Sequence, residues 1–282
     1  MSLPALLGPE PTTGDEPPAL SARGLTVGYA GRRVLEALDV DVPAGSFTAV
    51  VGPNACGKST LLKALAGQLP PTAGEVAVSG RPLAQLRRKA LARRLGFLPQ
   101  TPTAPPGITV AELVSRGRYP HRPAWTATVA ARATATEADR AAVADALART
   151  GTADLADRDV AELSGGQRQR VWLALVLAQQ APLLLLDEPT TYLDLPHQLD
   201  VLDLCAHLRS GGHTVVAVLH DLNLAARYAT HLIAMRDGRI VAEGAPGDIV
   251  TADVVTRAFG LDCRVVPDPE TGTPLVVPRA RP

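Results

Sequence analysis

Residues 52–60 read Gly52-Pro53-Asn54-Ala55-Cys56-Gly57-Lys58-Ser59-Thr60, which fits the phosphate-binding pattern G-x-x-x-x-G-K-[ST]. An apolar run at 47–51 precedes the stretch and a helix-favouring run at 61–66 follows it, so the pattern stands between a predicted strand and a predicted helix. Small residues allow backbone N–H groups to surround a polyphosphate, and the positive end of the helix adds to the attraction. We expect Lys58 to contact the β and γ phosphates and Ser59 to bind Mg²⁺. All residues from 52 to 60 are therefore predicted to form a nucleoside-triphosphate site.

The composition is that of a globular protein with balanced charge. A chain of 282 residues with 46% hydrophobic content is long enough for one large domain or two small ones. The formal net charge is zero, which gives no indication of a nucleic-acid partner. The three cysteines are too few and too widely spaced for a disulfide framework, which favours a reducing compartment. No apolar run reaches the about 18–20 residues of a membrane span, so we expect a soluble chain.

Apolar segments alternate with helix-favouring ones over most of the chain. Short strands are predicted first, at 25–29, 34–42, 47–51 and 75–78, and strands separated by helices follow at 183–186, 214–219 and 232–235. This alternation predicts a mainly parallel sheet flanked by helices. We expect a proline-rich disordered tail at 1–20, an ATP-binding domain at 21–250 with a helical insertion at about 102–163, and a C-terminal extension of short strands or loop at 251–282.

A second part of the site is predicted at Leu183-Leu184-Leu185-Leu186-Asp187-Glu188, an apolar strand that ends in two carboxylates. A strand that delivers an aspartate beside a phosphate loop provides the usual metal partner of that loop. We expect Asp187 to hold Mg²⁺ and Glu188 to act as the general base on the attacking water. The alternative is that the pair caps a helix before Pro189, but the phosphate loop already requires a partner for Mg²⁺.

The octapeptide Leu163-Ser164-Gly165-Gly166-Gln167-Arg168-Gln169-Arg170 predicts a second anion site, because Ser164 can cap the helix that follows and the glycines expose its first amides. It closely resembles the signature of ATP-binding cassette (ABC) ATPases. The resemblance implies an α/β fold with a P-loop NTPase core, a mainly parallel sheet, an N-terminal antiparallel β subdomain and a helical insertion. It also implies a head-to-tail dimer, in which residues Leu163, Ser164, Gly165, Gly166 and Gln167 of one copy act on the ATP of the other.

Four more positions take roles that rest on this resemblance. Tyr29 matches the aromatic residue that stacks on adenine, and Gln100 matches the glutamine that reaches Mg²⁺ and the attacking water. Asp194 matches the loop that crosses the dimer interface, and His220 matches the histidine that contacts the γ-phosphate. Taken alone, Tyr29 would be read as a core residue, Gln100 as a loop residue and His220 as a structural one. Many members have glycine where this chain has Ala55; the general pattern leaves that position free, so we expect binding to survive with an altered backbone.

The branch of the family is indicated by several short segments of the sequence. They are similar to the ATPases of bacterial ferric-siderophore importers of the ferric-enterobactin and ferric-dicitrate type, and they read Arg116-Gly117-Arg118-Tyr119-Pro120-His121, Thr190-Thr191-Tyr192-Leu193-Asp194, Pro196-His197-Gln198, Leu219-His220-Asp221-Leu222-Asn223 and Gly272-Thr273-Pro274-Leu275-Val276-Val277-Pro278. The resemblance implies ATP and Mg²⁺ as ligands, two permease subunits as partners, a separate binding protein that delivers cargo, and a peripheral position on the cytoplasmic face of the membrane.

Residues 116–121 are expected to form a docking rim for the permease, the alternative being an exposed loop with stray charges. Two other functions stay open. An importer of haem, cobalamin or metal would share every catalytic residue. A soluble, non-transport ABC ATPase usually carries two cassettes or a long coiled-coil insertion, which this chain lacks.

Overall fold

The computed structural model describes residues 17–29, 31–122 and 136–280. Its central element is a six-stranded sheet in the order β10-β9-β3-β8-β7-β6. All neighbours in this sheet run parallel except β10, which pairs antiparallel with β9 at one edge. The strands are β3 (Phe47–Val51), β6 (Leu95–Leu98), β7 (Leu183–Asp187), β8 (Thr214–Val218), β9 (His231–Arg236) and β10 (Arg239–Gly244). The mainly parallel sheet predicted from the sequence is thus confirmed.

A second sheet, formed by the N-terminal part of the chain, is antiparallel throughout and has the order β2-β1-β4-β5. Its strands are β1 (Leu20–Tyr29), β2 (Arg32–Val42), β4 (Ala73–Val78) and β5 (Arg81–Pro82). The predicted antiparallel subdomain is confirmed, although β1 begins five residues before the predicted strand at 25–29. The extra residues pair with both β2 and β4. Pairing with distant strands extends β1 and cannot be recognised from a local apolar pattern.

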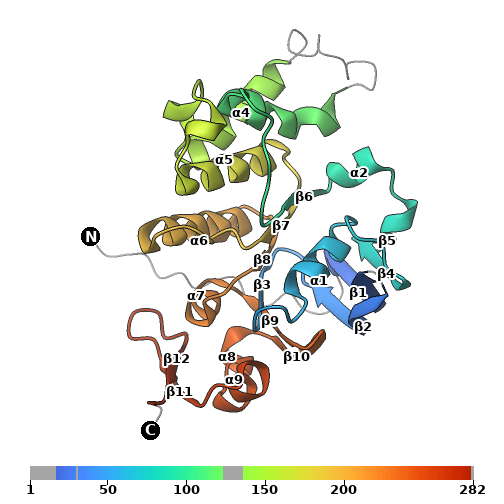
Figure 1. Cartoon of the computed structure of the whole chain (residues 1–282), viewed down its shortest axis with the longest axis vertical. Helices are drawn as coiled ribbons and strands as arrows, with labels where there is room; N and C mark the ends of the chain where they lie inside the picture. The colour runs from blue at the N-terminus through green and yellow to red at the C-terminus, as the bar shows by residue number, and fades with distance from the viewer. Residues whose placement is uncertain (1–16, 30, 123–135, 281–282) are drawn as a thin grey trace.

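The parallel sheet is covered on both faces (Figure 1). Helix α1 (Lys58–Leu65) lies between it and the antiparallel sheet, while α6 (Leu195–Ser210) and α7 (Leu222–Tyr228) cover the opposite face. The leucines of β7 show the consequence for the sequence: Leu183 and Leu185 belong to the core around α1, and Leu184 and Leu186 to the core around α6. A strand buried on both sides therefore reads as an unbroken apolar run.

A helical layer extends from the β6 edge of the sheet. Helix α5 (Gly165–Ala178) packs against α3 (Val110–Ser115), α4 (Glu137–Arg149) and the 3₁₀ segment η2 (Arg116–His121). Shorter turns complete this region and its approach, namely η1 (Leu83–Gln85), α2 (Arg88–Ala92), η5 (Ala153–Leu155) and η6 (Val160–Glu162). The predicted insertion at 102–163 covers α3 to η6, and part of it lies outside the described residues. Its boundaries therefore remain a prediction.

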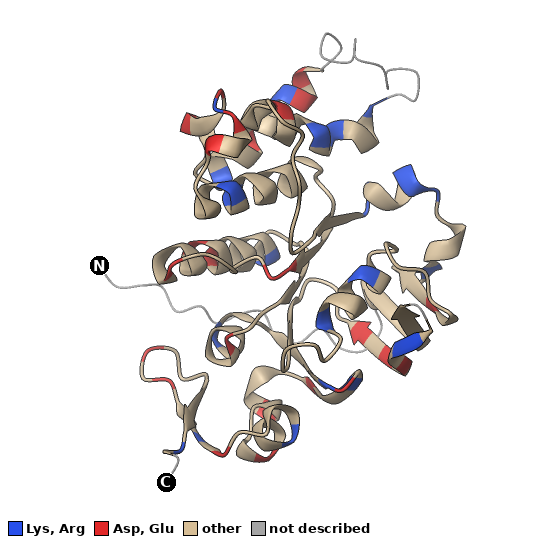
Figure 2. Cartoon of the chain, viewed as in Figure 1, with Lys and Arg blue, Asp and Glu red and all other residues tan. Residues whose placement is uncertain are grey.

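The C-terminal part begins with α8 (Pro246–Ile249) and α9 (Ala252–Phe259), and it ends in an antiparallel hairpin of β11 (Cys263–Pro267) and β12 (Pro274–Pro278) that packs on α7. The predicted tail at 1–20 lies outside the described residues except for its last four positions, of which Leu20 begins β1. Basic and acidic residues are interspersed over the sheets and helices in Figure 2, in keeping with a net charge of zero.

The segment η2, expected to form a docking rim, is largely an internal structural element. Arg118 is only 4% exposed. Its guanidinium donates to Asp139 Oδ1 of α4, to the carbonyl oxygen of Ala178 at the end of α5 and to Gln180 Oε1 just beyond that helix, at 2.8 Å each. One buried arginine thus ties η2, α4 and α5 together, and only Arg116 and Tyr119 of this segment are exposed.

Burial raises the pKa of the Asp139 carboxyl, but hydrogen bonds from Arg118 and Thr136 and the charge of Arg118 outweigh it and bring the pKa below its usual value. We expect Asp139→Ala to lower the free energy of unfolding by about 3–5 kcal/mol, because it leaves Arg118 buried without its counter-charge. A depressed carboxyl pKa stabilises the fold above the unfolded-state pKa of about 3.9. The loss should therefore be complete at neutral pH and shrink as the pH falls through the folded-state pKa.

Urea unfolding at several pH values measures this difference. The matched control is Asp145→Ala on the same helix, where the carboxylate is 65% exposed and lies 3.8 Å from Arg149; it should cost about 0.5 kcal/mol or less. Equal losses for the two variants would contradict the structural role of Asp139.

Candidate active site

The loop between β3 and α1 has a backbone that only small residues can adopt. Gly52 has φ 153° and Gly57 has φ 107°. A Cβ on Gly52 would lie 2.3 Å from the carbonyl oxygen of Met235, so a side chain there would collide with the neighbouring strand. Gly57 occupies the N-cap of α1 and has no side chain to occupy the first free amides of the helix. These amides are consequently available to an anion.

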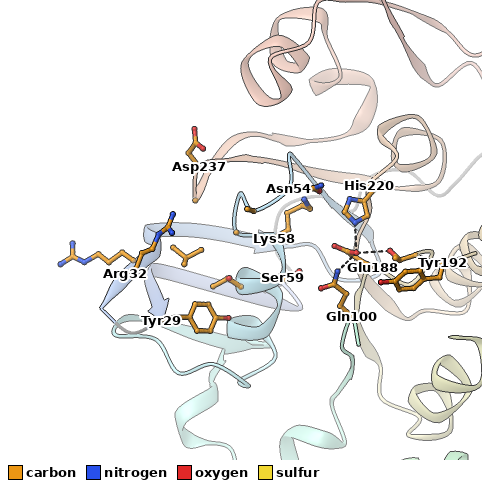
Figure 3. Close-up of a pocket in the computed structure, with 17 residues that line it drawn as sticks. Tyr29, Arg32, Asn54, Lys58, Ser59, Gln100, Glu188, Tyr192, His220 and Asp237 are labelled. Carbon is orange, nitrogen blue, oxygen red and sulfur yellow. Dashed lines mark hydrogen bonds and ion pairs between the residues drawn. The ribbon is translucent and has the colours of Figure 1, made fainter. Parts of the chain in front are cut away.

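Lys58 projects from the first turn of α1 back over the loop (Figure 3). Its ammonium donates to Gly52 O at 2.8 Å and to Pro53 O at 2.9 Å, and the residue is only 5% exposed. These carbonyl bonds compensate the burial of the charge. They also hold the ammonium above the loop, where a bound phosphate would lie.

Ser59 and Asp187 meet at the end of β7. The Ser59 hydroxyl donates to Asp187 Oδ1 at 2.8 Å. Asp187 is fully buried, and within the described part of the chain its Oδ2 has no hydrogen-bond partner. Burial raises the pKa of this carboxyl, and the weaker effect of the Ser59 bond lowers it only in part. A hydroxyl and a carboxylate with an unpartnered oxygen are the hard donors that Mg²⁺ prefers, so these residues fit that ion.

Glu188 follows Asp187 and is held by three neighbours. Its Oε2 accepts from Gln100 Nε2 at 2.8 Å and from Thr191 Oγ1 at 3.1 Å, and it pairs with His220 Nε2 at 2.8 Å (Figure 3). Its backbone is left-handed, with φ 56°, a strained conformation that is common at functional sites. Burial raises the pKa of the Glu188 carboxyl, but the bond and charge of His220 and the bonds from Thr191 and Gln100 together bring it below its usual value. The carboxylate is therefore kept ionised.

These groups face one cleft of about 980 Å³. Of the predicted site residues, those that line it are Tyr29, Asn54, Ala55, Gly57, Lys58, Ser59, Thr60, Gln100, Glu188 and His220. Gly52, Pro53 and Cys56 shape the loop without lining the cleft, and Asp187 reaches its wall through Ser59. Sequence reasoning did not assign Arg32, Arg33, Thr191, Tyr192 and Asp237 to this cleft. The closeness of Arg32 and Arg33 to Tyr29 in the sequence could have indicated that they line the same cleft. No sequence pattern indicates this for Asp237, which lies in the turn between β9 and β10.

The signature segment lies elsewhere. Among the described residues that line the cleft, none belongs to 163–167, and Asp194 is not among them. Ser164 caps α5 through a reciprocal pair of bonds: it accepts from Gln167 N at 3.3 Å, and Ser164 N donates to Gln167 Oε1 at 3.1 Å. A Cβ at Gly166 would lie 3.2 Å from Leu193 Cδ2, so this helix start and the loop before Asp194 are neighbours. The roles assigned to these residues stay predictions.

Comparisons with known proteins agree with this geometry. A sequence profile of the ABC transporter family matches residues 35–191. The ferric enterobactin transport ATP-binding protein FepC of Escherichia coli is 51% identical over 263 residues, which cover 93% of this chain and 94% of the relative. The chain is also similar to a solved ABC transporter described as metal-chelate type in an inward-facing conformation (30% identity, TM-score 0.77, 93% and 98% coverage). A dimeric cassette in a post-hydrolysis state with ADP and phosphate matches with 28% identity and a TM-score of 0.69 over 80% of this chain and 98% of its own.

The backbone conformation of Ala55 in the phosphate loop gives a test of stability. Ala55 has φ 60°, a left-handed conformation that costs an alanine about 1–2 kcal/mol and a glycine little. Because glycine also loses more entropy on folding, we expect Ala55→Gly to raise the free energy of unfolding by about 0.5–1 kcal/mol, measured by urea denaturation. The control Ala144→Gly in the exposed face of α4 should lower it by about 1 kcal/mol. A loss of stability in both variants would contradict backbone strain at Ala55.

Proposed function

We propose that this chain, which belongs to the ABC transporter family, is the ATP-hydrolysing subunit of an importer that energises the uptake of ferric siderophores. The observation that carries the ATPase assignment is the convergence of Gln100, Glu188 and His220 across the cleft from Lys58. The cargo is supported by the similarity to a ferric enterobactin transport protein along nearly the whole chain.

In the proposed reaction, ATP is hydrolysed to ADP and phosphate. The loop amides and Lys58 bind the phosphates, and Tyr29, which is 47% exposed at the cleft, stacks on the adenine. Glu188, kept ionised by its neighbours, accepts a proton from the attacking water while Gln100 orients that water. His220 stabilises the charge that develops on the γ-phosphate. Mg²⁺, held by Ser59, Asp187 and Gln100, would neutralise phosphate charge when bound.

The active form is proposed to be a head-to-tail dimer of two copies. In it, Ser164 and the glycines after it in one copy complete the ATP site of the other. The exposure of Tyr192 (85%) and Leu195 (61%), large apolar residues on either side of Asp194, supports an interface at this surface. The similarity to a cassette solved as a dimer supports the formation of a dimer.

The transport partners are proposed to be two permease subunits, with an extracytoplasmic siderophore-binding protein that contributes indirectly. Within the described residues, no helix has the length and apolar character needed to cross a lipid bilayer. We place the chain at the cytoplasmic face of the cell membrane, as a peripheral subunit. Importers of haem, cobalamin or metal would use the same ATPase chemistry, so they differ from the proposal only in cargo.

The role of Glu188 can be tested with Glu188→Gln, which keeps the shape of the side chain and removes the base. We expect ATP to bind with a dissociation constant within about threefold of the wild-type value, and hydrolysis to fall by about 10²–10⁴-fold. With ATP and Mg²⁺, the variant should accumulate as a dimer in size-exclusion chromatography, because the complex is no longer turned over. The control Glu75→Gln, at an exposed position of β4, should hydrolyse ATP normally. Full turnover by Glu188→Gln would remove this residue from the base role.

The cargo can be tested by uptake in cells that lack this gene. A panel of ferric siderophores labelled with radioactive iron is supplied, together with labelled haem and cobalamin. We expect uptake of at least one ferric siderophore to be lost, to return with the wild-type gene and to stay absent with Glu188→Gln. Unchanged siderophore uptake with loss of haem or cobalamin uptake would overturn the siderophore assignment and leave the ATPase assignment standing.

A further inference from the structure

One side chain of α7 forms two hydrogen bonds to the C-terminal hairpin. Asn223 of α7 accepts from Val276 N at 2.8 Å through its Oδ1 and donates to Val276 O at 3.2 Å through its Nδ2. Its carboxamide therefore bonds to β12 in the way that a neighbouring strand would. The pairing of β12 with β11 leaves the N–H and C=O of Val276 on the opposite edge of β12. Asn223 satisfies both of these backbone groups, and Val276 is only 7% exposed.

Asn223 also stands close to the reacting groups along the chain. It lies in the first turn of α7, three residues after His220. Asp221 caps this turn by accepting from the backbone N–H groups of Asn223 at 2.8 Å and Leu224 at 2.9 Å. Before His220, the end of β8 is fixed by the bond from Leu219 N to Val50 O at 3.1 Å. The backbone of His220 is thus held between the sheet on one side and the start of α7 on the other.

The position of His220 depends strongly on these two supports, because its own side chain is 45% exposed. A half-exposed ring has few packing contacts to fix it, yet its Nε2 lies 2.8 Å from Glu188 Oε2. The hairpin packs on α7, and Val276 and Cys263 belong to the same buried cluster as Ala225 and Ala226 of that helix. Figure 1 shows β11 and β12 beside α7 on the side away from the helical layer.

We propose that Asn223 is a positioning residue for hydrolysis: by pairing with Val276, it makes the C-terminal hairpin a brace for α7 that holds His220 against Glu188. The inference rests on the proposed ATPase function.

The first test compares Asn223→Ala with Thr256→Val. The Asn223 change removes both bonds to Val276 but leaves the Asp221 cap intact, because that cap uses the backbone N–H of residue 223. Thr256→Val removes a different bond of the C-terminal part, from Thr256 Oγ1 to Leu261 O at 3.1 Å, which does not involve α7. We expect kcat for ATP to fall about tenfold in Asn223→Ala with KM within about twofold, since a small misplacement near the reacting atoms affects the chemical step. Thr256→Val should keep both constants.

The second test follows His220 itself and requires no hydrolysis. The protein has six histidines, and in ring-labelled protein the NMR signal of His220 is assigned by its absence in His220→Asn. We expect this signal to shift or broaden in Asn223→Ala and to stay in place in Thr256→Val. Asn223→Asp, which keeps the acceptor for Val276 N and loses the donor, should give an intermediate shift and provides the test if the alanine variant does not fold.

The outcomes distinguish a failure of the positioning role of Asn223 from a failure of the proposed ATPase function. An unmoved His220 signal and normal kcat in the Asn223 variants would contradict the proposal that the hairpin holds His220 in position through Asn223. An equal loss of kcat in Thr256→Val would contradict it as well. A wild-type protein that does not hydrolyse ATP would instead contradict the proposed function, and the NMR comparison would still decide whether Asn223 positions His220.

Discussion

The site depends on the parallel alignment of four adjacent strands, β3, β8, β7 and β6. In a parallel sheet the carboxyl ends of the strands share one edge, so the segments that follow them are brought together however far apart they lie in the sequence. The phosphate loop follows β3, His220 comes just after β8, Asp187 and Glu188 come at the end of β7, and Gln100 comes just after β6. A slip of one strand would move its functional side chain away from the cleft and its apolar residues to the wrong core. Fold and site are therefore specified by the same pairing.

The edge where these segments meet is also where the backbone is strained. Three non-glycine residues that line the cleft have a left-handed backbone, namely Ala55, Glu188 and Tyr192. Such conformations cost of order 1–3 kcal/mol each, so they persist only where other interactions hold them. For Glu188 the bonds from Gln100, Thr191 and His220 are of the charged kind, worth about 1.5–3 kcal/mol each. The same bonds that keep the carboxylate ionised thus also offset the strain that turns it into the cleft.

Much of the fold could be predicted from the sequence because its central strands are buried on both faces. The runs that became β3, β7 and β8 are mostly apolar and hence easy to recognise, whereas β6 was not predicted. That strand is short and contains Gly96, and a Cβ at Gly96 would lie 2.8 Å from Val176 of α5, so the glycine reflects a helix contact that only the folded chain reveals. The buried Arg118 was missed for a similar reason: its partners lie on other elements, and an isolated arginine is normally expected on the surface. The phosphate loop was recognised from residue spacing, but the roles of Tyr29, Gln100 and His220 came from resemblance, since a single residue of those types carries little information.

The distribution of functional residues within one chain has a physical consequence for the proposed mechanism. One surface carries the phosphate loop with Glu188 and His220, and Ser164 at the start of α5 lies outside that cleft. In the chain alone, Gln167 occupies the hydroxyl of Ser164 through the capping box, while the free amides of the first turn stay available to an anion. If the second copy supplies the phosphate, closure of the dimer brings an anion to those amides at the same time as it covers the cleft. ATP would then be the ligand that joins the two copies, and its hydrolysis would remove the γ-phosphate contacts that hold them together. Transport requires such a link, because a ligand can shift a conformational equilibrium only through interactions that differ between its states.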